Sequence, residues 1–324
     1  KKLSTNLNKL IAVLVLTAMT TAASAQSGTN SPYSQFGLGD LTDQSTGFNK
    51  GMNGVGLAMR KGNELNLTNP ASYSSVDSLS MIFDAGLSGQ VTNFKENGVR
   101  LNAKSGGFDY VAGLFRAAKG LGVSFGMIPY SNIGYKYATS TTLSDIQTSV
   151  VSTYEGSGGL HQLFVGAGWN PVKSLSIGFN FSYLWGKYAR SVTTGSTSTV
   201  NTLSKEYSAD VNNYKLDLGI QYEQPVGKYD KLAFGATWSL GHSLKSDPTC
   251  RIISKNSNIS KSDTTSFTVV NGLSIPDIYS IGVAYSHANT LRLGADVQLQ
   301  KWGSVDMPQD EGGVYTLKSG TCLS

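Results

Sequence analysis

The sequence predicts an all-β protein, a transmembrane antiparallel β-barrel with an N-terminal plug, or hatch. Three features support this fold class: a secretory leader, long segments in which apolar and polar residues alternate, and a low content of charge. Charged residues make up 15% of the chain, whereas an average soluble domain has about 25%. Such a composition is typical of outer-membrane barrels, whose strands present one face to lipid and the other to the lumen.

Residues 1–25 have the three parts of a secretory signal peptide. A basic start is followed by an apolar run and then by small residues at the cleavage position, Ala23-Ser24-Ala25. The apolar run is far shorter than the roughly 20 residues of a spanning helix, and no cysteine follows Ala25 to carry a lipid. We therefore expect cleavage after Ala25 and export to the outer membrane of a Gram-negative cell.

Charge argues against nucleic acid as a partner. The whole chain carries a formal charge of +5, but three of its lysines lie in the leader. The remaining chain has 23 Lys and Arg against 21 Asp and Glu, and no basic cluster interleaved with aromatic residues.

Strands are predicted wherever apolar and polar residues alternate over a long stretch. The clearest case is residues 214–223, where Tyr214, Leu216, Leu218, Ile220 and Tyr222 alternate with polar residues and glycine. Membrane strands need about 9–11 residues, against about 5–6 for an average soluble strand. We expect the apolar series to face lipid, so that Leu218→Arg should cost about 2–4 kcal/mol and Gly219→Ala less. Similar alternation occurs in residues 79–88, 108–115, 121–130, 161–169, 175–188, 232–240, 278–285 and 291–300.

The connections between these segments differ in length. Residues 170–174 and 224–231 are short, whereas residues 139–159, 190–209 and 245–272 are long and polar. Short periplasmic turns and long extracellular loops are typical of such barrels. Within the second long stretch, Ser191–Ser204 is rich in Ser and Thr and is predicted to be a loop tip.

Two glycine motifs suggest enzymatic sites but lack the required context. Gly122-Val123-Ser124-Phe125-Gly126 matches a nucleophile elbow, yet it lies inside an alternating strand with no helix after it. Gly51–Gly56 suggests a phosphate loop, yet no strand precedes it. We interpret the first as small lumen-facing residues and the second as a tight turn.

Histidines and cysteines also fail to form a site. His161, His242 and His287 lie in separate segments without a second ligand at metal spacing. Cys250 and Cys322 are far apart, so two unpaired thiols are favoured over a disulfide. We therefore expect no catalytic residue, no cofactor and no metal, and the chain is not predicted to be an enzyme.

Residues 26–78 are rich in Gly, Asn and Ser and lack strand periodicity, which suggests a plug inside the barrel. A rigid bend is predicted at Asn69-Pro70-Ala71, because proline fixes its own φ and biases the preceding residue toward an extended conformation.

The plug also carries a family resemblance. Gly51–Gly56 followed by Asn69-Pro70-Ala71-Ser72 resembles the hatch of the FadL-type long-chain fatty-acid transporter family. Ser31–Asp40 resembles the start of that hatch, while Leu273–Tyr285 and Leu291–Trp302 resemble later strands. The resemblance extends over nearly all of the chain beyond the leader.

The resemblance implies a passive channel for hydrophobic small molecules such as long-chain fatty acids. Its hatch or gating residues would be Phe36, Gly54, Gly56, Asn69, Pro70 and Ala71. Related barrels with Asn-Pro-Ala serve secretion, so the alternative is a non-transporting barrel subunit of an outer-membrane assembly or secretion complex. A β-rich soluble periplasmic protein is the third hypothesis. Expected partners are membrane lipids, lipopolysaccharide and a hydrophobic ligand, with outer-membrane proteins as partners in the alternative.

The predicted organisation is a leader (1–25), a hatch (26–78) and a barrel (79–324). The family closes 14 strands, whereas alternation predicts only nine or ten here. We therefore expect about four C-terminal strands to be missing, with the first strand (near Leu79–Val91) and the last (near Leu291–Trp302) unpaired to each other.

Overall fold

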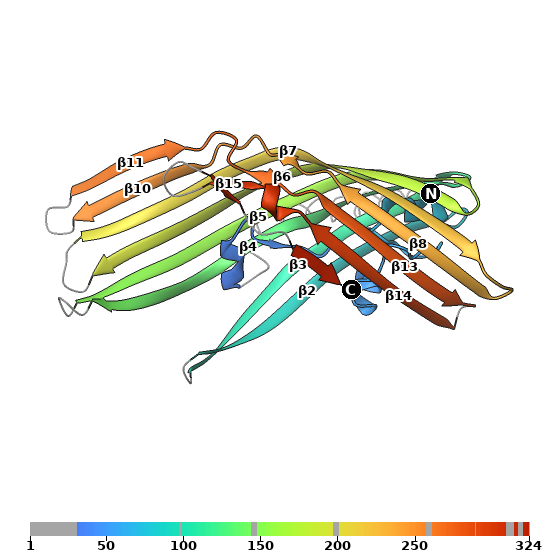
Figure 1. Ribbon diagram of the computed structural model, residues 1–324, viewed down its shortest axis with the longest axis horizontal. Helices are drawn as coiled ribbons and strands as arrows, with labels where there is room; N and C mark the ends of the chain where they lie inside the picture. The colour runs from blue at the N-terminus through green and yellow to red at the C-terminus, as the bar shows by residue number, and fades with distance from the viewer. Residues whose placement is uncertain are drawn as a thin grey trace, which may run out of the picture.

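A curled antiparallel sheet makes up most of the protein (Figure 1). The computed structural model describes residues 31–96, 99–143, 148–196, 201–256, 261–288, 290–308, 314–316 and 320–323. The sheet confirms the predicted antiparallel β-barrel class, here as a half-barrel. Its long strands are β2 (Met81–Glu96), β3 (Val99–Ala118), β4 (Leu121–Leu143), β5 (Thr148–Val172), β6 (Leu175–Ser196), β7 (Asn201–Pro225), β8 (Asp230–Ser239), β13 (Ile278–His287) and β14 (Leu291–Gln300).

Short elements lie at the ends of the sheet and on its concave face. Among the described residues no helix is both long and apolar enough to cross a membrane. The short strands are β1 (Asp40–Leu41), β9 (His242–Ser243), β10 (Thr249–Asn256), β11 (Lys261–Thr268), β12 (Ser274–Ile275), β15 (Asp306–Pro308), β16 (Val314–Thr316) and β17 (Gly320–Leu323). The helices are α2 (Gly47–Gly51) and the 3-10 turns η1 (Pro32–Gln35), η2 (Pro70–Ser75) and η3 (Trp302–Ser304).

The wall is open in the part of the chain that the structure describes. The long strands follow the order β14-β13-β8-β7-β6-β5-β4-β3-β2. At one edge β2 pairs with β3, and at the other β14 pairs with β13 and, over four residues, with β17. β2 and β14 are not paired to each other there, as expected from a strand count below the 14 of the resembling family.

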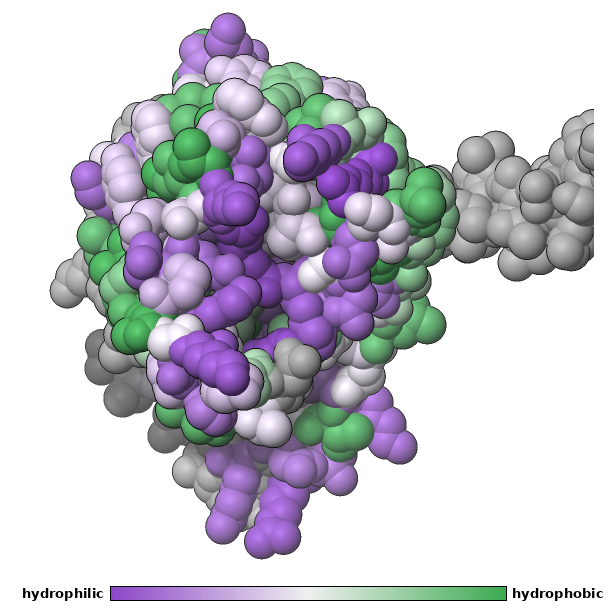
Figure 2. Space-filling view, turned by 90° about the vertical axis from the view of Figure 1, so that its right-hand side faces the viewer, coloured by the Kyte–Doolittle hydropathy of each residue, from purple (hydrophilic) through white to green (hydrophobic). Residues whose placement is uncertain are grey.

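The two faces of the strands are divided as expected. On β7, Tyr214, Leu218, Ile220 and Tyr222 are 40–44% exposed, whereas Lys215 and Gln221 on the other face are buried. The exposed apolar side chains continue across neighbouring strands. Figure 2 shows hydrophobic residues around the rim and a hollowed hydrophilic centre. The series includes Leu163, Val165, Trp169, Ile177, Phe179, Phe181, Tyr183, Phe234, Trp238, Tyr279, Ile281, Val283, Leu293 and Val297.

Short turns gather at one end of the sheet. They connect β3 to β4, β5 to β6, β7 to β8 and β13 to β14. The pairings of Leu175 with Tyr222 and of His287 with Asp230 place them at the same level.

At the opposite end two predicted loops are wrong. Residues 139–159 and 190–209 are mostly strand, since β4 to β7 continue far past the apolar belt. Ser, Thr and Tyr residues in and beside these ranges pair across strands: Ser152 Oγ lies 3.1 Å from Thr194 Oγ1, and Tyr154 stacks on Tyr137 with ring centroids 4.9 Å apart. Polarity there reflects strands in water rather than coil, because these residue types favour extended backbone.

The remaining sequence-based boundaries also shift. The third predicted loop, 245–272, contains the hairpin β10–β11, which pairs with β7. In Ser191–Ser204, strand extends to Ser196 and resumes at Asn201, and residues 197–200 lie outside the described part. The first long strand begins at Met81 and not at Leu79 as predicted. Leu79 has a φ of 57°, which is not an extended conformation, and its side chain is fully exposed.

Residues 31–78, called the hatch below, lie against the concave face of the sheet. Leu65, Leu67, Tyr73 and Val76 pack in one apolar cluster with wall residues of β3, β4 and β5. The predicted leader, residues 1–25, lies outside the described residues. Cys250 is buried on β10, and the side chain of Cys322 lies outside the described part.

Candidate functional site

Asn69 joins three parts of the molecule. Its Oδ1 accepts from the backbone N–H of Ala71 at 3.0 Å and caps η2. Its Nδ2 donates to the carbonyl of Leu57 at 2.8 Å and to the carbonyl of Ile220 on β7 at 3.1 Å. The side chain is fully buried, so each of these hydrogen bonds replaces water that the site excludes.

Glycines of the strands contact the backbone of the hatch. A Cβ atom added at Gly178 or Gly168 would lie within 3.0 Å of backbone atoms of Pro70, and one at Gly122 would meet the carbonyl of Tyr73. Gly235 faces the carbonyl of Leu57 in the same way. Glycines on β4, β5, β6 and β8 of the one sheet therefore let the hatch backbone approach closer than any side chain would permit.

Gly219→Ala, expected to cost less than Leu218→Arg, would not be free of strain in this arrangement. A Cβ atom at Gly219 on β7 would collide with Oδ1 of Asn69 and lie 2.8 Å from Cδ of Pro70. The small inward residue is needed for contact with the hatch, which alternation alone does not reveal.

The turn at Gly54–Leu57 is tied to two strands. Oδ2 of Asp296 on β14 accepts the N–H groups of Gly56 at 2.7 Å and of Leu57 at 2.9 Å. Nε2 of Gln221 on β7 donates to the carbonyls of Leu57 at 2.8 Å and Met59 at 3.2 Å. A charged acceptor thus binds the N–H groups of the turn, and an amide donor binds its carbonyl groups.

Most of the predicted hatch residues come together around this turn. Gly54 adopts a φ of 84°, which glycine tolerates, and Gly56 packs between Thr68, Asn49 and Asn66 without room for a Cβ atom. Pro70 and Ala71 are buried against the wall. Phe36 lies apart, just after η1, with a half-exposed side chain.

Asp296 and Gln221 are hatch ligands that sequence reasoning missed. Each belongs to the polar series of a strongly alternating strand, next to apolar residues that face outward. The sequence does show a carboxylate on the inward face of such a strand. It does not show that the partner of this carboxylate is Leu57, 239 residues earlier in the chain.

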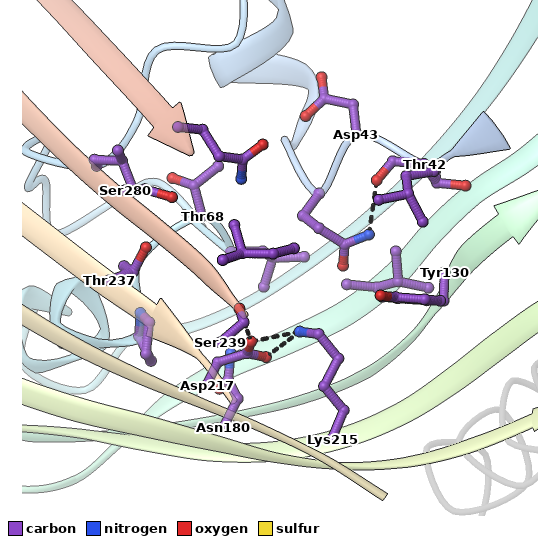
Figure 3. A pocket seen from close by; sticks show the side chains of 18 of the residues that line it. Thr42, Asp43, Thr68, Tyr130, Asn180, Lys215, Asp217, Thr237, Ser239 and Ser280 are labelled. Carbon is purple, nitrogen blue, oxygen red and sulfur yellow. Dashed lines mark hydrogen bonds and ion pairs between the residues drawn. The ribbon is translucent and has the colours of Figure 1, made fainter. Parts of the chain in front are cut away.

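A chamber of about 470 Å³ lies beside the hatch on the concave face. Most residues that line it are polar. Lys215 is bound by the carboxylate of Asp217, which also accepts from the hydroxyl of Ser239 (Figure 3). These side chains point inward from β7 and β8, with Tyr130 of β4 and Thr42 of the hatch on another side.

An apolar layer borders the chamber toward the end opposite the short turns. There the inward-facing residues Tyr130, Leu160, Leu184 and Val211 are buried with Leu38 of the hatch. Residues from the segments after β8 and β14 complete the cluster: Leu244, Leu273, Ile275, Val305 and Met307.

No metal site accompanies the chamber: no group of three or more His, Cys, Asp or Glu in the described residues is arranged to hold a metal ion. Ser124 of the apparent nucleophile motif is fully buried, and its hydroxyl donates to the carbonyl of Gly113 at 2.9 Å.

Solved structures of similar fold include three channels. The chain superposes on the Ralstonia pickettii toluene transporter TbuX with a TM-score of 0.56 and 13% identity, covering 86% of this chain and 82% of that one. The monoaromatic hydrocarbon channel CymD gives 0.54 and 11%, covering 89% and 79%. A deltaS2S3 mutant of the monoaromatic hydrocarbon channel TodX gives 0.54 and 12%, covering 79% and 72%. At these identities the likeness concerns the fold.

No curated protein matches the sequence. One family model does, that of BamG, and it covers residues 7–318. The resemblance to FadL-type transporters is thus met at the level of the barrel fold, while the family model carries a different name. Because this match spans nearly the whole sequence, the chain belongs to the BamG family.

Proposed function

We propose that this chain is a barrel subunit of an outer-membrane assembly complex and that its lumen does not conduct solutes. The observation that carries the proposal is the seating of the hatch on wall glycines. A conducting pore would require the hatch to move, and its backbone is fitted against Gly122, Gly168, Gly178 and Gly235. Asp296 and Gln221 add hydrogen bonds worth about 0.5–1.5 kcal/mol each, or more for the charged acceptor.

The chamber is poorly matched to a fatty acid. Its lining contains one lysine and three aspartates, Asp43, Asp217 and Asp296, so it repels a carboxylate. The apolar layer around Leu184 and Val211 is buried together with Leu38 of the hatch, so a solute moving past it along the inner face would have to displace these contacts.

The exterior suits a lipid bilayer. Apolar side chains of β5 to β8 and β13 to β14 form a belt in which Trp169, Tyr183, Tyr214 and Tyr222 are exposed. Aromatic residues at both edges of an apolar band are typical of outer-membrane barrels. Membership of the BamG family, over residues 7–318, adds weight to the assembly role. Export would remove residues 1–25 by cleavage after Ala25.

The test is to deplete the protein in its native cell and follow two quantities together. We expect the amounts of other folded outer-membrane barrels to fall. Uptake of radiolabelled toluene and oleate should fall by no more than the amounts of these barrels do. Tagged protein purified in mild detergent should retain other outer-membrane assembly proteins in fixed ratio. Unchanged barrel levels with a selective loss of toluene or oleate uptake would contradict the proposal.

A channel for small hydrophobic molecules is the second candidate, favoured by the fold likeness to three hydrocarbon channels. In that role Gly54, Gly56, Asn69, Pro70 and Ala71 would belong to the gate, with Phe36 at its entrance. The two roles differ in whether the hatch must move. A cross-link between Leu57→Cys and Gln221→Cys should abolish uptake by a channel, whereas an assembly subunit should keep its function. Reduction of the cross-link in the same cells is the control.

A further inference from the structure

The short turns at one end of the sheet carry positive charge without a counter-charge. The residues of the four turns that connect long strands there include three lysines, Lys119, Lys173 and Lys228, and no acidic residue. One lysine lies in each of the turns β3–β4, β5–β6 and β7–β8. All three side chains are exposed, and none forms an ion pair within the described residues. They are called the lysine row below.

Hydrogen bonds hold the three turns side by side, at the right-hand end of the sheet in Figure 1. The backbone N–H of Asn170 donates to the carbonyl of Gly120 at 2.8 Å, which joins the turn β5–β6 to the turn β3–β4. The N–H of Glu223 donates to the carbonyl of Ser174 at 2.8 Å, which joins the end of β7 to the turn β5–β6. The three ammonium groups therefore act on the same stretch of the rim.

The acidic residues next to the turn β7–β8 already have other partners. Glu223 lies 3.1 Å from the ammonium group of Lys231, and Asp230 lies 2.7 Å from Nδ1 of His287. Lys228 itself lies over the ring of Tyr229, with its ammonium group 5.3 Å from the ring centroid. The positive charge of the lysine row is thus available to an anionic partner outside the chain.

Exposed apolar side chains lie directly beside the lysines. Val172 precedes Lys173, and Val226 and Tyr229 belong to the turn β7–β8; each of these three apolar side chains is more than half exposed. Trp169, at the nearby edge of the apolar belt, is exposed as well. A lysine can lay its apolar stem along such a surface while its ammonium group reaches polar surroundings. This mixture matches the boundary between acyl chains and headgroups of a bilayer, whereas an acidic protein surface would match the lysines alone.

We propose that the lysine row binds the anionic headgroups of phospholipids in the periplasmic leaflet of the membrane. Short turns of outer-membrane barrels lie on the periplasmic side, and each lysine near a membrane surface strengthens the attraction to anionic lipid. The proposal rests on insertion of the apolar belt into a bilayer. It depends neither on the assembly role nor on the channel role, so its failure would leave both open to their own test.

The test is quenching of tryptophan fluorescence by brominated lipids. The full chain keeps Trp169 as its only tryptophan, the other three being replaced by Phe, and is reconstituted into phosphatidylcholine vesicles. Part of the lipid is brominated phosphatidylglycerol in one sample and brominated phosphatidylcholine in the other. We expect phosphatidylglycerol to be favoured about three-fold over phosphatidylcholine at Trp169. Added salt should reduce this preference, because it screens exposed charges.

Three variants of this protein separate the charge of the lysine row from other effects. Replacement of all three lysines by Gln should bring the preference close to one, whereas replacement of all three by Arg keeps the charge and should keep the preference. The matched control changes the net charge equally at exposed lysines toward the opposite end of the sheet, and it should also keep the preference: Lys104→Gln, Lys245→Gln and Lys255→Gln.

Equal quenching by the two brominated lipids, or a preference that survives replacement of the lysine row by Gln, would overturn the proposal. Loss of a co-purifying protein from the Gln variant, without any lipid preference in the unchanged row, would assign the lysines to a protein partner and overturn it too. Absence of quenching by either lipid would contradict the insertion on which the proposal rests.

Discussion

Oδ2 of Asp296 accepts the backbone N–H of Leu57 at 2.9 Å, which ties the last long strand of the sheet to the hatch. The same oxygen accepts the N–H of Gly56 at 2.7 Å. Four predictions concern the contacts between the sheet and the hatch and the apolar belt on the outer face of the sheet.

Asp296→Asn should loosen the hatch. The amide keeps the shape but loses the charge that strengthens both hydrogen bonds, and its NH₂ group cannot accept from an N–H. We expect a loss of about 1–3 kcal/mol, measured by urea unfolding of the protein in detergent, with faster proteolysis within residues 31–78. Asp263→Asn on exposed β11 is the matched control. Equal stability of the two variants would contradict the role of Asp296.

Gly178→Ala should displace the hatch because the new methyl group meets backbone atoms of Pro70 and Ala71, which have no rotamer with which to move away. Overpacking of this kind costs about 1–3 kcal/mol. The measurement is the midpoint of thermal unfolding, followed by the shift of the folded band in gel electrophoresis. Gly89→Ala on β2 has nothing within 4 Å of its added Cβ atom and should be neutral. A neutral Gly178→Ala would mean that the hatch is not seated as described.

Asn69→Asp should keep the cap of η2 but lose both amide hydrogen bonds. The carboxylate would also face the carbonyl oxygens of Leu57 and Ile220. We expect a destabilisation of at least about 1–3 kcal/mol, again by urea unfolding. Asn93→Asp on the exposed face of β2 makes the same chemical change without such partners. If both variants unfold at the same urea concentration, the buried amide has no anchoring role.

Leu218→Arg should hinder insertion into a bilayer, at a cost of about 2–4 kcal/mol. Leu203→Arg provides a close control, because it lies on the same strand, β7, and both leucines are 40% exposed. Leu203 lies in the strand extension beyond the apolar belt, so its arginine variant should fold into lipid vesicles nearly as well as the unchanged protein. Equal folding yields for the two variants would place the belt outside the membrane.

The local sequence was sufficient to predict the strands and their orientation. A strand has a side-chain period of two, so the alternation in residues 214–223 predicts both an extended backbone and which face is apolar. A second local rule, the effect of proline on its own φ and on the preceding residue, explains the bend at Asn69-Pro70-Ala71, where Asn69 is extended and η2 begins at Pro70. Local rules do not show that residues 139–159 and 190–209 are mostly strand, because a polar strand in water and a polar loop have the same composition.

Only the tertiary structure decided what the inward face does. Gly219 and Gly178 look like neutral lumen positions in the sequence, yet each is fixed by a hatch residue more than a hundred positions away in the chain. The partners of Asp296 and Gln221 are likewise set by the curvature of the sheet, which brings β7 and β14 to one hatch turn. Local periodicity contains no information about such distant backbone contacts, because they depend on how the whole wall curls around residues 31–78.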